Sequence, residues 1–220
     1  MRLAFLLAGK DLRIEMRGMK RLSVLLLFSF VLVLVGSFAY RGQGDDVAHL
    51  PPLLWLALVF TQLFFLGETY RPEMENHCFD ALCISPAKGY QLLFGKLLSS
   101  TAIVLAISVA ILLEITFFAS TLALLRLEIL VLIVLETIGL LSLGNLFFAR
   151  MAAGDTQGFE LYPLVIVLSI PLVFIAVEAS RLVLSDASGG TKAPFYLLLI
   201  LYDVLLLVTS AVTYRAMIGD

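Results

Sequence analysis

Long apolar stretches with few charged residues alternate with short polar segments along the chain. A helix needs about 20 apolar residues, within a range of about 17 to 25, to cross a hydrocarbon core roughly 30 Å thick. Six stretches have this length, so the pattern predicts an all-α polytopic membrane protein with one transmembrane domain over residues 1–220. The stretches are residues 22–40, 50–67, 97–119, 127–149, 161–177 and 193–214.

The third and fourth stretches form one apolar region that only Glu114, Arg126, Glu128 and Glu136 interrupt. This region has more than 50 residues, which is too long for a single span. We therefore expect a tight turn around residues 120–126, with an antiparallel helix on each side.

The distribution of Lys and Arg predicts the orientation. With a cytoplasmic N-terminus, 11 of the 15 basic residues lie on the inner side, and only Arg41, Arg126, Arg181 and Lys192 lie outside. The positive-inside rule then favours six spans with both termini in the cytoplasm.

The N-terminal residues 1–21 can form a helix that places Lys10, Arg13 and Arg17 on one stripe, separate from its apolar residues. This suits a helix in the membrane interface, and a short basic anchor without specific contacts is the alternative. The apolar stretch that follows is longer than the core of a secretory signal, so we expect it to be retained.

Composition agrees with a membrane protein surrounded by lipid, because 61% of the residues are hydrophobic and only 15% are charged. Soluble domains contain roughly 25% charged residues. The net charge of -2 gives no reason to expect a nucleic-acid partner.

The longest predicted inner connection is residues 68–96, and a connection of this length in a compact membrane domain is usually functional. Its apolar residues have no reason to stay in water, so we expect a short helix across the membrane face that ends at a proline. As a docking segment for a partner, we single out Glu73, Glu75, Phe79, Asp80, Leu82 and Pro86.

Gly89, Gly95 and Lys96 come close to the spacing of a nucleotide-binding P-loop. However, five residues separate the glycines instead of four, and Leu97 occupies the position of the magnesium-binding hydroxyl. We therefore predict that this chain does not hydrolyse ATP, that the two glycines let the chain turn into the membrane, and that Lys96 anchors the third span.

No metal site or catalytic residue is predicted. Cys78 and Cys83 beside His77 match no common zinc spacing, and no second ligand pair exists elsewhere in the chain. His49 fits a membrane-interface residue, and no motif of a serine hydrolase or an intramembrane metalloprotease occurs.

Glu136 and Asp203 lie near the middle of the fourth and sixth spans, with no Lys or Arg at the same depth. Carboxyls in the membrane are costly and mark a function or a polar packing contact. We expect them to hydrogen-bond hydroxyls such as those of Thr137, Tyr202 or Thr209, or to contact another subunit. Plain helix packing and a role in substrate passage or subunit docking both remain open.

Pro163 and Pro171 are predicted to break the fifth span. Proline leaves a carbonyl of the preceding turn without its backbone donor, so neighbouring groups must supply a hydrogen bond to it. Gly139 and Gly144 in the fourth span allow helices to approach closely, although their spacing is not that of a GxxxG motif.

Several segments, in this order and spacing, resemble the CcmB family. They are KDLRIEMR (10–17), LLWLALVFTQLFFLGETYRPEMENHCFDALCISP (53–86), FGKLL (94–98), LGNLFFARMAAGDTQGFELYPLVIVLSIPLVFIAVEASRLVL (143–184) and LYDVLLL (201–207).

The resemblance implies an ABC-2-like permease subunit for haem export or delivery in cytochrome c biogenesis, in the bacterial inner membrane. It also implies a separate ATPase, CcmA, the membrane subunits CcmC and CcmD, the periplasmic haem chaperone CcmE, and a homodimer of the permease. Residues 73–86 would be the coupling helix that fits a groove of the ATPase. No bound cofactor is expected, and haem would be the transported ligand. A permease for a lipid or drug, or a scaffold that holds haem-handling partners without transport, are the alternatives.

Overall fold

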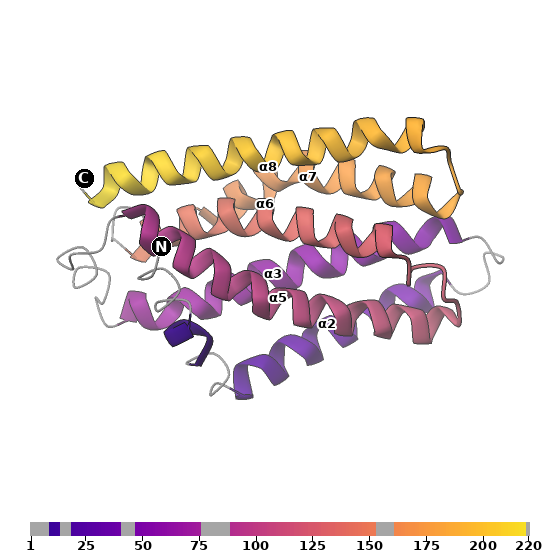
Figure 1. The fold of residues 1–220 in the computed structure, drawn as a ribbon. Coiled ribbons are helices and arrows are strands. Elements are labelled where there is room, and N and C mark those ends of the chain that lie inside the picture. The colour runs from indigo at the N-terminus through magenta and orange to yellow at the C-terminus, as the bar shows by residue number, and fades with distance from the viewer. Residues whose placement is uncertain (1–8, 14–18, 41–46, 76–88, 153–160, 219–220) are drawn as a thin grey trace.

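The computed structural model describes residues 9–13, 19–40, 47–75, 89–152 and 161–218. Within these ranges there is no strand, and six helices are long and apolar enough to cross a membrane, which confirms the predicted fold class (Figure 1). These helices are α2 (Met19–Ala39), α3 (Leu50–Glu75), α5 (Gly89–Ala119), α6 (Leu127–Ala152), α7 (Leu161–Leu184) and α8 (Gly189–Ile218), and the 3-10 turn η1 (Val47–His49) precedes α3.

Several helices extend beyond the predicted spans. α3 continues to Glu75, and α5 begins at Gly89, so both ends of the predicted inner connection 68–96 are helical. Only residues 76–88 between them lie outside the described part. Of the predicted N-terminal helix, residues 9–13 are helical and α2 begins at Met19, but the structure does not test its position in the interface.

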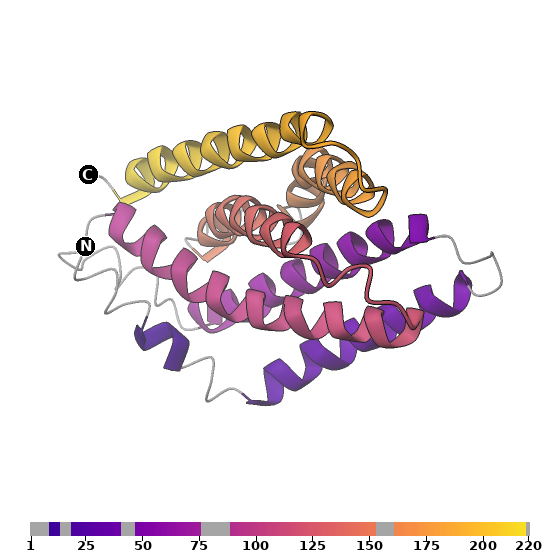
Figure 2. The same cartoon turned by 45° about the vertical axis from the view of Figure 1, so that its right-hand side comes forward.

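The central helix of the bundle is α6, which packs against α3, α5, α7 and α8 (Figures 1 and 2). In the apolar spans of α3 and α6, 72% and 61% of the span is buried inside the bundle, whereas in those of α2 and α8 only 17% and 22% is buried. The outer faces of α2 and α8 carry exposed apolar side chains such as Leu27 and Leu201, which suits contact with lipid chains. α3 also reaches α7, where Trp55 Nε1 donates a hydrogen bond to Ser180 Oγ at 2.9 Å.

The two ends of the bundle differ in their connections. The α5–α6 and α7–α8 turns lie together at one end, which we call the turn end (Figure 1). At the other end, the connection end, α3 finishes, α5 begins and α8 finishes. This alternation is that of six antiparallel spans in sequence.

The predicted tight turn around residues 120–126 is confirmed. α5 ends with Ser120 in the left-handed conformation (φ 51°), while Thr121 N bonds Thr116 O and Ser120 N bonds Phe117 O. α7 ends in the same way at Asp186 (φ 52°). Both are Schellman-type endings, which satisfy the last carbonyls of a helix and reverse the chain within a few residues.

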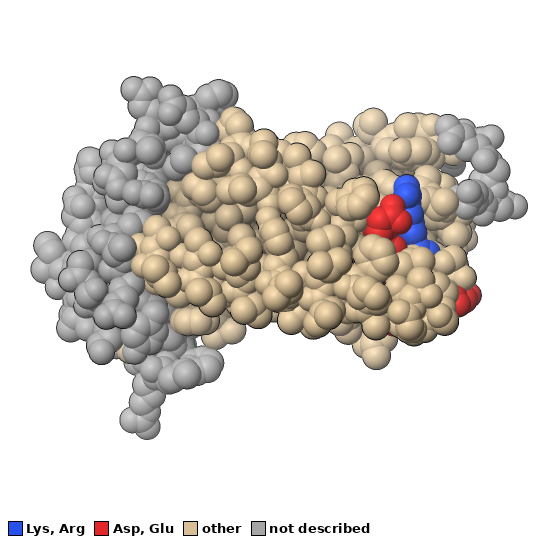
Figure 3. Space-filling view, turned by 90° about the horizontal axis from the view of Figure 1, so that it is seen from above, with Lys and Arg blue, Asp and Glu red and all other residues tan. Residues whose placement is uncertain are grey.

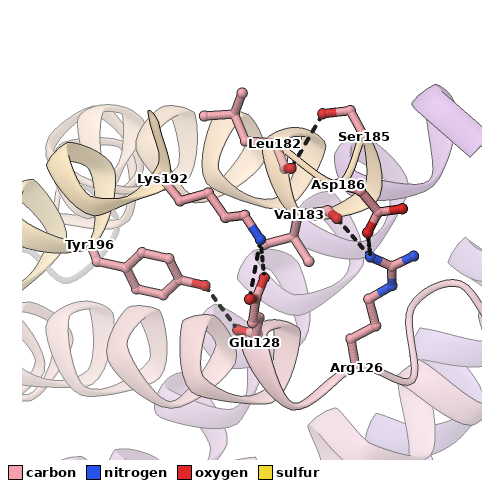
Figure 4. Close-up of polar contacts among 8 residues, drawn as sticks. All are labelled: Arg126, Glu128, Leu182, Val183, Ser185, Asp186, Lys192 and Tyr196. Atoms are coloured by element: carbon pink, nitrogen blue, oxygen red, sulfur yellow. Dashed lines mark hydrogen bonds and ion pairs between the residues drawn. The ribbon is translucent and has the colours of Figure 1, made fainter. Parts of the chain in front are cut away.

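Four charged residues connect the two turns, and we call them the charge clamp: Arg126, Glu128, Asp186 and Lys192 (Figure 4). Arg126 donates to the Asp186 carboxylate and, at 2.9 Å, to the Val183 carbonyl. Lys192 Nζ lies 2.8 Å from Glu128 Oε2 and 3.1 Å from its other oxygen.

A third pair at this end lies within α7, where Arg181 and Glu178 are 2.9 Å apart. Each basic residue described at the turn end therefore has an acidic partner, and the three bases are balanced by three acids. On the face shown in Figure 3, the visible charged side chains gather towards one end, and the rest of the described surface is uncharged. Local neutralisation is compatible with the orientation that the sequence predicts, in which these basic residues lie on the side that the positive-inside rule disfavours.

The Arg126–Asp186 pair predicts a pH dependence of stability. The hydrogen bond from Arg126 and the attraction of its charge lower the pKa of Asp186, and the same hydrogen bond raises the pKa of Arg126. A carboxyl whose pKa is lower in the folded state stabilises the fold at pH values above its unfolded pKa of about 3.9. This contribution is lost as the pH falls through the folded pKa.

We therefore expect Arg126→Gln to lower the thermal unfolding midpoint in detergent slightly at pH 7, and by less at pH 3, which lies below the unfolded pKa of an aspartate. The effect should be small and sensitive to salt because the pair is exposed. Asp186→Asn serves as the matched variant. A difference of the same size at both pH values would contradict this account of the pair.

Candidate functional site

Polar side chains line α6 on the faces that it turns towards α3 and α8. Glu136, Thr137, Ser142 and Asn145 are each 0% exposed, in a helix whose other buried residues are apolar. We call these residues and their neighbours the polar seam. Its members are Glu136, Thr137, Ser142 and Asn145 of α6, Gln62 and Tyr70 of α3, and Asp203 and Ser210 of α8.

On the α3 side, hydrogen bonds join the two helices at two levels. Gln62 Nε2 donates to Glu136 Oε2 at 2.8 Å. The Tyr70 hydroxyl lies 3.1 Å from Asn145 Oδ1 and 3.2 Å from the Asn145 carbonyl. Between these levels Leu66 packs so closely on Gly144 that a Cβ there would overlap its side chain.

Gln62, Leu66 and Tyr70 are four residues apart, so they lie on one face of α3. That face follows α6 from mid-depth to the connection end. Hydrogen bonds between membrane helices contribute about 0.6 to 2 kcal/mol each. The seam therefore fixes the register of α3 against α6.

On the α8 side, Asp203 lies over Gly139 of α6. Asp203 is 4% exposed, and a Cβ on Gly139 would overlap its Oδ1 and crowd Leu172 of α7. Neither carboxyl oxygen of Asp203 has a hydrogen-bond partner among the described residues. Two turns further along α8, the Ser210 hydroxyl donates to the Ser142 carbonyl at 2.8 Å. The close approach that the sequence predicts for Gly139 and Gly144 is confirmed.

The predicted hydroxyl partners of the two carboxyls are wrong. Tyr202 donates to the Leu168 carbonyl, and Thr209 bonds the carbonyl four residues earlier in its own helix. The Thr137 hydroxyl has no partner in the part of the chain that the structure describes. Serine and threonine hydroxyls in helices readily bond the preceding turn, which removes them as donors to other helices.

Sequence reasoning missed Gln62, Tyr70 and Asn145. The signal was available, because an amide in a long apolar run is costly to bury without a partner, just as a carboxyl is. The absence of charge on these side chains is the reason that they were overlooked.

The two prolines of α7 behave differently. Pro163 is the third residue of the helix, where a backbone N–H has no intrahelical acceptor, so it does not break the span as predicted. Pro171 lies inside the helix, which continues through it to Leu184, so this proline does not break the span either. Hydroxyls supply donors to carbonyls just before it, since Tyr202 bonds Leu168 O at 2.7 Å and Ser169 bonds Ile166 O at 2.7 Å.

The residues resembling a P-loop lie in the first turns of α5. Gly95 does not turn the chain into the membrane, which corrects that part of the prediction, because it is buried within the helix. Gly89 begins the helix, and the residues before it lie outside the described part, so its role in a turn stays a prediction. A helix cannot curl its N–H groups around phosphates as a P-loop does. Lys96 Nζ lies 4.3 Å from the centre of the Tyr70 ring, so its ammonium interacts with an aromatic face.

Most of the predicted docking segment is outside the described residues. Glu73 and Glu75 belong to the last turn of α3, but their side chains are not described. The remaining residues of this segment lie wholly outside the described part of the chain: Phe79, Asp80, Leu82 and Pro86, together with His77, Cys78 and Cys83. His49 stacks on Tyr40 with ring centres 5.0 Å apart, and no cluster of metal-binding side chains occurs in the described ranges.

A family model described as CcmB protein matches residues 2–217, which is nearly the whole chain. Neither the comparison with curated proteins nor that with solved structures gives a match. The family is one of transport permease subunits, and the six helices that are long and apolar enough to cross a membrane agree with such a role. The chain therefore belongs to the CcmB family, the multi-pass bacterial membrane permease subunits of the ABC-type haem exporter in cytochrome c maturation.

Proposed function

We propose that this chain couples ATP hydrolysis by a separate ATPase subunit to the transfer of haem to a periplasmic chaperone. The family match over residues 2–217 is the observation that carries the proposal. The ATPase would be CcmA, the chaperone CcmE, and the other membrane partners CcmC and CcmD. The haem is the transported ligand and not a resident cofactor.

The lengths of α3 and α5 support docking at the connection end. At about 1.5 Å per residue, the 26 residues of α3 extend about 39 Å and the 31 residues of α5 about 46 Å. Both exceed a hydrocarbon core of roughly 30 Å. The apolar part of α3 ends at Arg71, four residues before the helix does. Residues 76–88 thus join the end of α3, which continues past its apolar part, to the start of α5.

The charge distribution supports a cytoplasmic connection end in the bacterial inner membrane, with both termini on that side. The basic residues of the turn end are neutralised locally, whereas most Lys and Arg of the sequence fall on the other side. Two copies in a two-fold dimer would give each of two ATPase subunits an equivalent docking segment.

The test is purification of the tagged chain after co-expression with CcmA, CcmC, CcmD and CcmE. We expect CcmA to co-purify, and we expect haem loading of CcmE to stop when CcmA carries an inactivating substitution in its own P-loop. Failure of CcmA to co-purify would overturn the proposal. Co-purification together with normal haem loading by inactive CcmA would favour the scaffold, and haem-independent ATP hydrolysis stimulated by a lipid would favour a different substrate.

A further inference from the structure

Tyr70 occupies the point where α3, α5 and α6 meet at the connection end. Its side chain is 0% exposed, and its ring stacks on Phe148 of α6 with centres 5.9 Å apart. The ammonium of Lys96 on α5 lies 4.3 Å from the ring centre, and the hydroxyl donates to Asn145 of α6. We call Tyr70, Lys96, Asn145 and Phe148 the three-helix lock.

The lock joins the two helices that flank residues 76–88 to the central helix of the bundle. Any displacement of that connection reaches the membrane through α3 and α5, because they are its two attachments. Beyond the lock, the same face of α3 contacts α6 again through Leu66 on Gly144 and through Gln62 on Glu136. The contacts form a continuous line from the connection end to the buried carboxyl at mid-depth.

The two kinds of contact in the lock respond differently to movement. The hydrogen bond from the Tyr70 hydroxyl to Asn145 is directional. The close packing of Leu66 on Gly144 also opposes sliding of α3 along α6, so the two helices keep their register. The attraction between an ammonium and an aromatic face tolerates a range of positions within about 6 Å of the ring centre. The contact between Lys96 and the Tyr70 ring therefore does not by itself fix the tilt of α5 against α3.

Resting on the proposed function, we propose that Tyr70 and Lys96 are positioning residues that transmit movement of the 76–88 connection to α6. α3 and α6 move as one body, and α5 pivots against them at Lys96. Packed helices shift between discrete arrangements more readily than they deform continuously, which suits a two-position device.

The test compares haem loaded onto CcmE for each ATP hydrolysed, in the full complex with CcmA, CcmC and CcmD. Tyr70→Phe removes the hydroxyl but keeps the ring, and Lys96→Met removes the charge but keeps the chain length. We expect either variant to retain CcmA and ATP hydrolysis, while haem loading per ATP falls about tenfold, a typical size for coupling between distant sites.

Lys96→Arg keeps a cation over the ring and should restore loading to the wild-type level. Tyr196→Phe is the matched control, since its hydroxyl bonds the Glu128 carbonyl at the turn end. Unchanged loading per ATP in Tyr70→Phe and Lys96→Met would overturn the inference. Loss of CcmA from these variants would also overturn it, because the residues would then serve assembly. Loss of CcmA from the wild-type complex instead removes the proposed function itself.

Discussion

Replacing Phe79 by alanine and Asp80 by lysine together is expected to weaken binding of the ATPase subunit while membrane insertion stays normal. Aromatic side chains are common anchors at the centre of interfaces, and truncating one costs about 2 kcal/mol or more. A reversed charge on the docking segment adds repulsion against a partner surface that suits an acid. We expect CcmA to co-purify at a level at least about tenfold lower, measured as the ratio of CcmA to permease.

The matched control makes the same changes in the shorter connection 153–160, which joins the end of α6 to the start of α7. Phe159→Ala with Asp155→Lys should leave the ratio of CcmA to permease near that of the wild type. Unchanged binding in the Phe79 and Asp80 variant, or equal loss in the control, would place the docking site elsewhere. Recovery of both variants from the membrane fraction verifies insertion.

Gly139→Ala is expected to destabilise the bundle. The new Cβ would overlap Oδ1 of Asp203 and crowd Leu172, so both side chains would have to shift in a closely packed contact between α6, α7 and α8. Overpacking of this kind costs about 1 to 3 kcal/mol. The measurement is thermal unfolding in a fixed detergent, followed by the loss of helical circular dichroism.

A second substitution tests the cause. Asp203→Ala removes the overlapping carboxyl, and it also removes two buried oxygens that lack partners among the described residues, so alone it should cost little. Gly139→Ala with Asp203→Ala should then be more stable than the sum of the single effects by about 0.5 to 3 kcal/mol. Gly190→Ala is the control, because a Cβ there meets nothing within 4 Å. Strict additivity would show that Asp203 does not press on Gly139.

The predicted spans were correct in number and approximate position, but not at their ends. Apolar length decides whether a segment enters the membrane, so 22–40 and 127–149 could be recognised from composition alone. A helix can extend beyond its apolar part, because its backbone hydrogen bonds do not depend on the polarity of the side chains. α5 accordingly begins at Gly89, eight residues before the predicted span. The turn at 120–126 could be predicted because an apolar region of that length must reverse.

The position of a buried polar residue along its span does not identify the residues that it contacts. Glu136 and Asp203 were identified because charge in an apolar run is rare. Gln62 bonds Glu136, 74 positions away in sequence, because α3 packs on α6. Asp203 lies over Gly139, 64 positions away, because α8 packs on the same helix.

The sequence by itself determined the membrane environment, the six helices, the family and the segment expected to dock an ATPase. These follow from properties of single segments: apolar length, the side on which Lys and Arg fall, and motif order. Only the tertiary structure decided that α6 is central, that the charges of the turn end form neutral pairs, and that Tyr70 joins three helices at the connection end. The physical reason is that side chains on one helix acquire partners only when another helix is packed against them, and small residues such as Gly139 and Gly144 decide where that packing is closest.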